Sequence, residues 1–298
     1  EIQDVEDEID IEDLIEEEAS VIAMTSLNYI KRTPLDTYKS QNRGGRGIIG
    51  MQTREEDAVT RLFVCSTHDY LLFFTNFGRV YRIKGYEVPE AGRTARGLAI
   101  VNLLSISQGE TITAVVPVRD FEKDDYLVMV TKSGVIKKTD MSAFANIRKT
   151  GITAVNLREG DELIAAFLTD GSKNIFAATR NGMGIMFDEN DVRPMGRTAT
   201  GVKAITLSDD DYVVSADFAD KEDKLLNVTE NGYGKRTDVE AFNVQHRGGK
   251  GVKIHQITDK TGLLSGVIKV SDNEELMIVT SEGVIIRLRG KEISTFGR

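Results

Sequence analysis

The stretch Val228-Thr229-Glu230-Asn231-Gly232, with Arg236 after it, decides the fold because variants of it occur six times along the chain. Each copy has a short apolar run that ends in threonine, followed by a turn and, in most copies, a basic residue. The threonines are Thr25, Thr75, Thr131, Thr179, Thr229 and Thr280. Their spacings are 50, 56, 48, 50 and 51 residues. Six copies at a nearly constant spacing indicate a repeat architecture.

The residues of each copy are typical of β structure. Asn181-Gly182 and Asn231-Gly232 favour hairpin turns, because both central residues of such a turn adopt positive φ. The apolar runs 71–74 and 126–130 are too short for helices between such turns and predict buried strands. Around the second copy we predict four strands of one blade, at residues 62–66, 71–75, 79–83 and 98–103. Four strands in each of six units predict an all-β ring of blades, which limits exposed sheet edges.

A second periodic element lies about 22 residues after most of the threonines. It is a glycine-containing basic segment, and its fullest copies are Gln41-Asn42-Arg43-Gly44-Gly45-Arg46-Gly47 and Gln245-His246-Arg247-Gly248-Gly249-Lys250-Gly251. Shorter copies run from Arg93 to Gly97, Arg148 to Gly151 and Arg197 to Gly201. Glycines let a backbone turn tightly and approach a ligand closely. Two cations in that frame suit a polyanion such as a nucleic-acid backbone, and the segment holds no nucleophile or general base.

Charge is distributed unevenly along the chain. The net charge of the 298 residues is −9, but residues 1–18 hold 11 acidic and no basic residues. The remainder has 36 acidic and 38 basic residues, a net charge of +2, so a nucleic-acid partner is not excluded. We interpret residues 1–18 as a solvated acidic linker and residues 19–298 as one domain. The alternative is that the acidic leader mimics DNA and covers the basic surface.

Several classes of protein find no support in the sequence. No apolar run approaches the roughly 20 residues of a membrane span, and no signal peptide opens the chain. Cys65 is the single cysteine, which fits a reducing, cytoplasmic compartment. His68, His246 and His255 lack metal-ligand spacing, and the glycine segments lack the ending of a nucleotide-binding P-loop.

The first basic segment, the six units and the recurring Arg-x-x-x-Gly pattern together resemble the C-terminal domain of the DNA gyrase A protein. The resemblance covers residues 10–298, and residues 41–47 correspond to the family's glutamine-arginine-glycine box, with Asn42 where a basic residue is usual. It implies a six-bladed β-pinwheel, whose blades resemble those of a propeller but exchange strands with their neighbours. It also implies chiral wrapping of duplex DNA around a basic rim, which lets gyrase, an ATP-dependent type IIA topoisomerase, introduce negative supercoils.

The resemblance implies partners as well. They are duplex DNA, the N-terminal region of the gyrase A protein, and the gyrase B protein in an A2B2 complex. The isolated domain is then expected to be monomeric, non-catalytic and free of cofactors, since ATP and Mg²⁺ would belong to other parts of the complex. We expect a cytoplasmic, nucleoid-associated protein without a membrane partner. The alternatives are the corresponding domain of topoisomerase IV and a propeller that serves as a protein-interaction scaffold.

The predicted DNA-binding residues form two groups. The box supplies Gln41, Arg43, Gly44, Gly45, Arg46 and Gly47. The rim supplies Arg93, Arg96, Arg148, Lys149, Arg197, Arg247 and Lys250. Lysine and arginine release counterions from phosphates and so give affinity with little sequence preference. The basic residues after each hairpin turn, Arg32, Arg82, Lys138, Arg236 and Arg287, either join this surface or pack along apolar strand faces. Met186 at the equivalent place predicts a weaker basic track in the fourth unit.

Replacement of Arg43 and Arg46 by alanine tests the box. We expect a change in stability within about 0.5 kcal/mol, because exposed loop substitutions seldom cost more. The variant should still bind linear duplex through the rim, but the full-length enzyme that carries it should relax DNA without adding negative supercoils. A plasmid topology assay measures this. Supercoiling at the parent's level would show that the box is only a turn, with no role in supercoiling.

Overall fold

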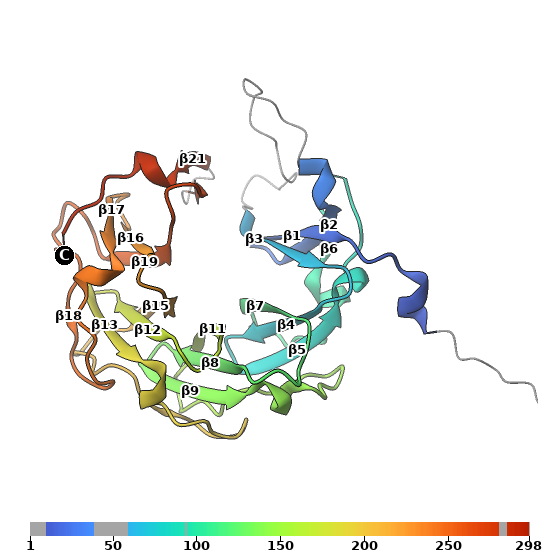
Figure 1. Ribbon diagram of the computed structural model, residues 1–298, viewed down its shortest axis with the longest axis horizontal. Coiled ribbons are helices and arrows are strands. Elements are labelled where there is room, and N and C mark those ends of the chain that lie inside the picture. The colour runs from blue at the N-terminus through green and yellow to red at the C-terminus, as the bar shows by residue number, and fades with distance from the viewer. Residues whose placement is uncertain (1–9, 39–58, 93, 280–284, 298) are drawn as a thin grey trace, which may run out of the picture. The chain divides into compact units, whose positions relative to one another are not determined.

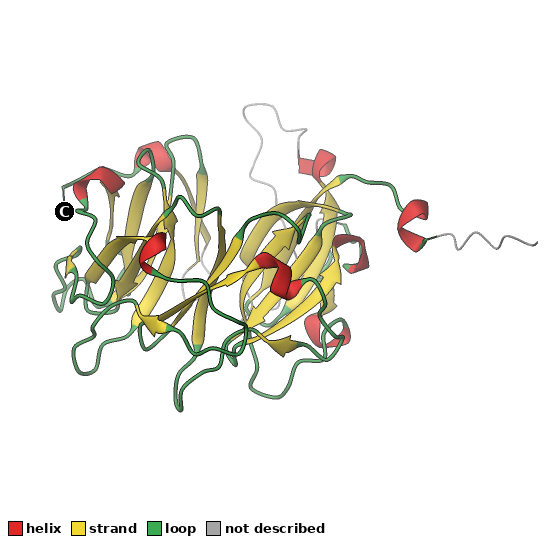
Figure 2. Cartoon of the chain, turned by 60° about the horizontal axis from the view of Figure 1, so that its bottom comes forward, coloured by secondary structure: helices red, strands yellow, loops and turns green. Residues whose placement is uncertain are grey.

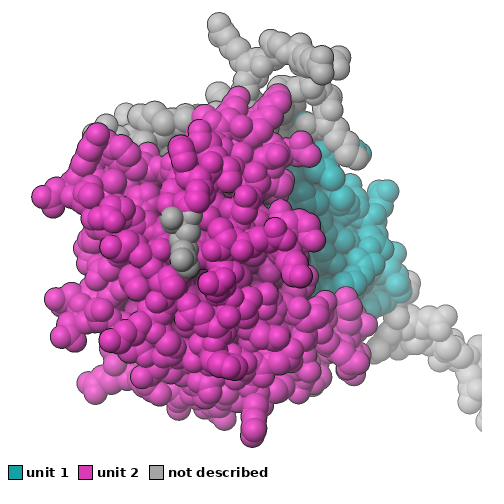
Figure 3. All heavy atoms as spheres, turned by 60° about the vertical axis from the view of Figure 1, so that its left-hand side comes forward, with its two compact units in different colours: residues 1–71, 82–105, 117–119 teal, residues 72–81, 106–116, 120–298 magenta. Residues whose placement is uncertain are grey.

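The computed structural model describes residues 10–38, 59–92, 94–279 and 285–297 of the chain. These residues form strands joined by loops, and the helices among them are single 3-10 turns of three or four residues (Figure 2). They fall into two compact units, which Figure 3 colours separately. Unit 1 takes residues up to 71 together with 82–105 and 117–119, and unit 2 takes 72–81, 106–116 and 120–298. The prediction of an all-β fold is confirmed.

Each repeat begins with a β-hairpin. The hairpins are β1 (Ala19–Thr25) with β2 (Tyr29–Pro34), β4 (Tyr70–Thr75) with β5 (Arg79–Lys84), β8 (Tyr126–Thr131) with β9 (Val135–Asp140), β12 (Asn174–Thr179) with β13 (Met183–Asp188), β16 (Lys224–Thr229) with β17 (Gly234–Asp238), and β20 (Glu275–Val279) with β21 (Ile285–Arg289). In the first five, the repeated threonine is the last residue of the first strand. The turn residue three positions later has positive φ, as in Asn28 (61°) and Gly182 (81°).

The hydroxyl of the repeated threonine explains its recurrence. Thr25, Thr131, Thr179 and Thr229 each accept a hydrogen bond of 3.2 Å at Oγ1 from the backbone N–H four residues later, at or just before the start of the second strand. The side chain therefore ties the two ends of the turn together. Serine and threonine form such local bonds readily, and threonine in addition favours a strand.

Two further strands complete a sheet. A long strand pairs with the first hairpin strand: β3 (Val59–Ser66), β7 (Ile112–Val118), β11 (Leu163–Thr169), β15 (Val213–Ala219) and β19 (Leu264–Lys269) fill this place. A two-residue strand pairs with the second hairpin strand, and this place is filled by β6 (Leu98–Ala99), β10 (Ile152–Thr153), β14 (Val202–Lys203) and β18 (Val252–Lys253). The orders are β3-β1-β2-β6, β10-β5-β4-β7, β11-β8-β9-β14 and β15-β12-β13-β18, with β17-β16-β19 and β20-β21 as smaller sheets in the described residues.

The two-residue strand always comes from the following repeat. β6 lies between β5 and β7 in the sequence, yet it pairs with β2, as Tyr29↔Ala99 and Ile30↔Leu98. β14 pairs in the same way with β9, as Val202↔Ile136. Consecutive repeats are thus joined by an exchanged strand.

This exchange corrects the predicted grouping of strands around the second copy. Residues 62–66 and 98–99 are strands, but they belong to the sheet of β1 and β2. The partners of β4 and β5 are β7 and β10 instead. Residues 100–102 form a 3-10 turn, η4 (Ile100–Asn102), rather than a continuation of the strand. Hydrophobic pattern locates a strand but does not specify its partner, because both candidate sheets offer a similar buried face.

The core lies between sheets, and the first hairpin strands are buried on both faces. In β4, Leu71 to Phe74 are fully buried, and in β8 Leu127 to Val130 are buried as well. Within unit 2, one cluster joins Val128 and Ile136 to Ile175, Phe187 and Val213 of the next repeat. In the same unit β15 contacts both β11 and β19 (Figure 1). Central strands buried on both faces account for the continuous apolar runs of the sequence.

The glycine that ends each basic segment has a structural reason. Gly97, Gly201 and Gly251 have φ of 88°, 107° and 72°. A Cβ atom there would overlap the carbonyl oxygen of Ile30, Ile136 or Gly184, respectively, in the second hairpin strand of the preceding repeat. At Gly151 a Cβ would meet the ring of Tyr81 at 2.7 Å. Glycine is therefore required for the exchanged strand to dock.

Gly201→Ala tests this requirement. We expect the free energy of unfolding to fall by about 1–3 kcal/mol, because the substitution combines positive φ with a backbone clash. Gly196→Ala is the matched control in the same loop, since its Cβ would meet nothing within 4 Å. It should change stability by less than about 1 kcal/mol. Equal denaturation curves for the two variants would contradict the docking role.

Candidate nucleic-acid interface

Among the described residues, loops at 88–97, 145–151, 192–201 and 242–251 carry the basic segments, and residues 293–297 occupy the corresponding place in the last repeat; we call these the basic loops. Four of them run beside the second hairpin strand of the preceding repeat through parallel bridges, Arg32↔Glu90, Lys138↔Pro194, Phe187↔Gln245 and Arg236↔Thr295. The loop at 145–151 is the short copy. The loops at 88–97, 192–201 and 242–251 are therefore fixed at one end by a bridge and at the other by the docked glycine.

Exposed cations project from these loops. Arg96, Arg148, Lys149 and Lys250 are all exposed to solvent. The guanidinium of Arg96 lies over the ring of Tyr29, 5.5 Å from its centroid, which orients the side chain without enclosing it. These four predicted rim residues are available to a large anionic partner.

Arg197 and Arg247 are half-buried and take part in the structure. Nη1 of Arg197 donates to the carbonyl of Thr153, and Nη1 of Arg247 donates to the carbonyl of Lys203, each at 3.1 Å. Both carbonyls belong to the exchanged strand of the preceding repeat, so the two contacts are equivalent. Nε of Arg247 also donates to the carbonyl of Asp191 at 3.0 Å. A guanidinium has five N–H donors, so each arginine retains donors for a phosphate.

The box and Arg93 lie outside the described residues. This applies to Gln41, Arg43, Gly44, Gly45, Arg46 and Gly47. The related segment at 245–251 is described, and its glycine backbone is engaged within the protein. The N–H of Gly248 donates to the carbonyl of Ala204 at 2.6 Å, and the carbonyl of Gly249 accepts from the N–H of Thr206 at 2.8 Å. In this copy these glycine groups join neighbouring repeats.

Of the basic residues that follow the hairpin turns, three are structural. Arg32, Lys138 and Arg236 are 9%, 2% and 4% exposed. Nε of Arg32 donates to the carbonyl of Val88 at 3.0 Å, and Nε of Arg236 to that of Ile293 at 2.8 Å. Nζ of Lys138 lies 3.5 Å from the buried carboxylate of Glu189. Arg32 and Arg236 therefore anchor the first residue of a basic loop, and Lys138 anchors the chain just before one.

Arg82 and Arg287 complete that set. Arg82 is partly exposed, with its guanidinium 4.6 Å from the centroid of the Tyr70 ring. The side chain of Arg287 lies outside the described part of the chain.

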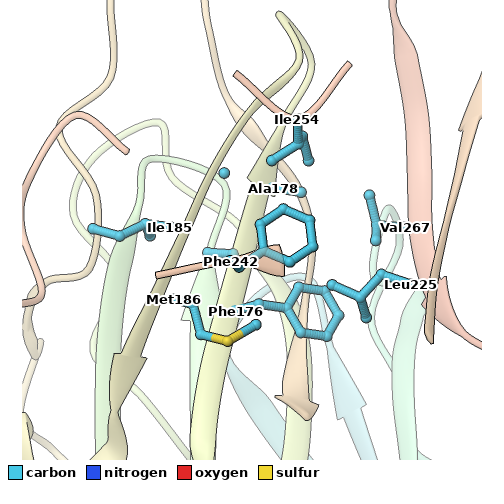
Figure 4. A pocket seen from close by; sticks show the side chains of 10 residues that line it. Phe176, Ala178, Ile185, Met186, Leu225, Phe242, Ile254 and Val267 are labelled. Atoms are coloured by element: carbon cyan, nitrogen blue, oxygen red, sulfur yellow. The ribbon is translucent and has the colours of Figure 1, made fainter. Parts of the chain in front are cut away.

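Met186 occupies the equivalent position in the fourth repeat and is also buried. It lines a small apolar pocket with Phe176, Leu225, Phe242 and Val267 (Figure 4). Because its counterparts Arg32, Lys138 and Arg236 face inward, the methionine removes no exposed charge. Relative to these three repeats the fourth loses no exposed cation at Met186, and apolar packing replaces the anchoring contact there; only relative to the partly exposed Arg82 is a charge absent.

Two exposed lysines were missed by the sequence reasoning. Lys203 and Lys253 are the second residues of the exchanged strands β14 and β18, and both are exposed. They follow Gly201 and Gly251 by two positions. That constant offset from the docked glycine is the signal that could have identified them, once the strand was known to lie at a sheet edge.

Two buried lysines donate hydrogen bonds to backbone carbonyls of the basic loops from the protein interior. Nζ of Lys31 donates to the carbonyl of Gly92 at 2.9 Å. Nζ of Lys137 donates to the carbonyls of Ala154, at 2.5 Å, Gly196, at 3.1 Å, and Arg197. Burial lowers the pKa of Lys31 to about 8. Burial, together with the charge of Arg197, lowers the pKa of Lys137 to about 7.

Part of the acidic leader contacts unit 1. Nζ of Lys84 lies 3.1 Å from a carboxylate oxygen of Glu12, and Arg32 lies 3.7 Å from Glu18. Arg119 pairs with Glu17 and lowers the pKa of that carboxyl. The carbonyl of Glu18 accepts from the N–H of Thr67 at 2.9 Å. Residues 10–18 therefore lie against the protein, while residues 1–9 are outside the described ranges.

The described residues offer neither a membrane-spanning helix nor a metal cluster. None of the helices in that part is long and apolar enough to cross a membrane. Within the same ranges no three His, Cys, Asp or Glu side chains are grouped so that they could hold a metal ion.

The burial of Lys137 predicts that stability depends on pH. Its folded-state pKa of about 7 lies below the ordinary 10.5, so between these values the unfolded chain binds more protons. The free energy of unfolding therefore gains a contribution from this residue as the pH rises through that window. Lys137→Met lacks the contribution. Urea denaturation at several pH values should show the parent gaining stability relative to the variant with rising pH, whereas a constant difference would contradict the shift.

Comparison with known proteins agrees with this geometry. The family model of the DNA gyrase C-terminal domain, beta-propeller, matches six segments, at residues 19–66, 69–119, 125–170, 173–220, 223–271 and 274–298. The DNA gyrase A protein of Halalkalibacterium halodurans is 59% identical over 293 residues, which cover 98% of this chain and 35% of that protein. The chain thus spans about a third of the length of the curated relatives it matches.

Two solved structures are similar in fold and sequence. The C-terminal domain of a DNA topoisomerase IV superposes with a TM-score of 0.79 at 28% identity, over 95% of this chain and 87% of that one. A DNA gyrase A C-terminal domain gives a TM-score of 0.75 at 27% identity, over 94% and 92%. The repeat boundaries, the propeller-type sheets and the identity to gyrase A proteins along the whole chain lead to one assignment: the chain belongs to the family of DNA gyrase A C-terminal domains.

Proposed function

We propose that this domain binds duplex DNA without sequence preference, and bends and wraps it with a defined hand along the basic loops. The observation that carries the proposal is the equivalence of these loops. Four of the five are joined to the preceding repeat by an equivalent parallel bridge; Arg96 and Lys250 are exposed on two of these loops, and Arg148 and Lys149 are exposed on the short copy at 145–151. Cations presented at equivalent places in successive repeats match the regular spacing of phosphates along a duplex better than a single concave site does.

The energetics are compatible with wrapping. Bending 20–30 base pairs by 40–90° costs on the order of 1–6 kcal/mol. Each cation that neutralises a phosphate releases counterions, so several contacts from successive loops offset this cost. Lys203 and Lys253 extend the exposed charge from the loops onto the exchanged strands. In the intact enzyme, a wrap of fixed hand is what converts strand passage into negative supercoiling.

We infer a six-bladed β-pinwheel as the complete architecture. The family model matches six repeats, and the exchanged strand joins each of four sheets to the following repeat. The chain is interpreted as an acidic linker, residues 1–18, followed by the wrapping domain, residues 19–298.

The partners follow from the curated relatives, which are DNA gyrase A proteins. We propose that the domain works within an A2B2 complex with the rest of the gyrase A protein and with the gyrase B protein. DNA cleavage, ATP hydrolysis and the Mg²⁺ requirement then reside in those other parts, and the isolated domain is monomeric, non-catalytic and free of cofactors. Its place in the cell would be the cytoplasm, in association with the nucleoid.

The alternative within the same class is the corresponding C-terminal domain of topoisomerase IV. Fold does not separate the two, because a topoisomerase IV domain and a gyrase domain superpose about equally well. Identity of 59% to a gyrase A protein across nearly the whole chain favours gyrase. A plasmid topology assay of the full-length enzyme separates them, since supercoiling of relaxed plasmid is expected only of gyrase.

Salt dependence of duplex affinity tests the binding itself. Arg148→Ala with Lys149→Ala should reduce the magnitude of the slope of log K against log salt by about 1.8, because each lost phosphate contact contributes about 0.9. Lys221→Ala is the control, an exposed lysine in the turn between β15 and β16. It should leave the slope unchanged. A parent domain whose duplex affinity does not depend on salt would favour a protein-interaction scaffold.

A further inference from the structure

A set of lysines lies beneath alternate basic loops. The residue just before the basic position of each hairpin is Lys31 in the first repeat, Lys137 in the third and Lys235 in the fifth. The second and fourth repeats have Tyr81 and Ile185 at this position. Nζ of each lysine donates to a carbonyl of the following basic loop, that of Gly92, Gly196 or Gly297, at 2.9, 3.1 and 3.1 Å. Lys31 and Lys137 are fully buried.

The contacted residue also alternates along the chain. Gly92, Gly196 and Gly297 occupy the same place in their loops, and arginine follows each of them. The loop after Ile185 has His246-Arg247 at that place, and the loop after Tyr81 is shorter. A lysine in the hairpin thus accompanies a Gly-Arg step in the next loop in all three cases. A purely local packing role for the lysine would not require that correspondence.

The glycines of these steps are not explained by internal crowding. A Cβ at Gly92, Gly196 or Gly297 would meet nothing within 4 Å, and none of the three has positive φ. The outward side of each step is therefore open. Each glycine is open to solvent on one side, and its carbonyl accepts a hydrogen bond from a lysine on the other. Such a position allows the close approach of a large ligand.

Lys137 shows how the step is held. When protonated, its ammonium group has three N–H donors, and its three acceptors are the consecutive carbonyls of Gly196 and Arg197 together with the carbonyl of Ala154. The carbonyls of the Gly-Arg step are consequently turned toward the interior. Carbonyl oxygens repel a phosphate, so turning them inward leaves a more favourable surface for an anion.

We propose that Lys31, Lys137 and Lys235 are positioning residues for DNA binding, each of which holds the glycine of the Gly-Arg step in the next basic loop through a hydrogen bond to its carbonyl. This inference rests on the proposed function. It divides the basic loops into two classes: those at 88–97, 192–201 and 293–297 are ordered in advance by a lysine, and those at 145–151 and 242–251 are not. Preordered loops contribute affinity because less conformational freedom is lost on binding.

Lys137→Met tests the proposal, because methionine keeps the length of the side chain and removes its donors. Duplex affinity should fall about 2- to 10-fold, the range expected when one or two side chains must be ordered on binding. Amide hydrogen exchange in residues 193–200 should become faster. Ile185→Met is the matched control at the equivalent position of the next repeat, and it should leave duplex affinity unchanged.

A double-mutant cycle separates positioning from a general structural role. Arg193 and Arg197 are the two arginines of the loop at 192–201, which Lys137 holds. If Lys137 affects DNA binding through this loop, Lys137→Met should have no further effect on affinity when both arginines are already alanine. It should keep its full effect when Arg148 and Lys149 are alanine instead. Equal effects in both backgrounds would overturn the proposal.

Lys235→Met takes the place of Lys137→Met if the latter does not fold, since Lys235 is less buried and donates to the one loop carbonyl of Gly297. Faster exchange in residues 293–297 together with weaker duplex binding supports the proposal. Unchanged exchange or unchanged affinity in this variant overturns it.

The outcome also separates this inference from the proposed function. A parent domain that shows no salt-dependent duplex binding refutes the proposed function itself. A parent that binds, with Lys137→Met showing faster exchange but unchanged affinity, refutes only the role of the lysine in DNA binding. Unchanged amide hydrogen exchange in Lys137→Met refutes the idea that Lys137 holds the loop at 192–201.

Discussion

The structure depends on one backbone pairing, in which the two-residue strand of each repeat docks on the second hairpin strand of the repeat before it. The pairing is short, as in Val202↔Ile136 and Lys203↔Val135, and it succeeds because Gly201 removes the Cβ that would strike the Ile136 carbonyl. A single sheet cannot be completed by the residues of its own repeat. Neighbouring repeats therefore fold onto one another, and every basic loop is carried to the same place relative to a sheet.

The same pairing divides the basic residues by role. Arg32, Lys138 and Arg236 lie on second hairpin strands and donate to backbone carbonyls at or near the start of the basic loop of the next repeat. Their charged groups are therefore engaged inside the protein. Lys138 with Glu189 is a buried pair, and breaking such a pair by removing one partner typically costs about 3–5 kcal/mol. Arg148, Lys149 and Lys250 project from the loops and remain exposed. The cations of the docking strands are thus structural, whereas these three cations of the loops remain exposed to solvent.

The loops themselves differ in how they are held. Lys137 donates to three carbonyls, two of them in the basic loop at 192–201, whereas Ile185 at the equivalent position of the next repeat has no side-chain donor. The loops therefore share one position in the repeat but not one mechanical character. The loop at 242–251 is held instead by hydrogen bonds of its own backbone, from the N–H of Gly248 to Ala204 and from the N–H of Thr206 to the carbonyl of Gly249.

The sequence by itself determined the local features of this protein, and only the tertiary structure decided which strands share a sheet and which cations face solvent. Threonine spacing, Asn-Gly turns and short apolar runs specify hairpins, since turn residues and the two-residue period act within a few positions. Of the predicted rim residues, Arg148 and Lys250 are exposed and Arg197 and Arg247 are half-buried, and the box at 41–47 lies outside the described residues; the DNA-binding role of both groups stays a prediction. Leu98 and Ala99 read as a strand in either sheet, and their pairing with β2 depends on a contact about 70 residues away in sequence (Tyr29↔Ala99). Arg32 and Arg96 look alike in the sequence, yet one donates to a buried carbonyl and the other lies exposed over an aromatic ring. Partner choice and burial are long-range properties, because they depend on what the rest of the chain places against a residue and not on the residue's own neighbours.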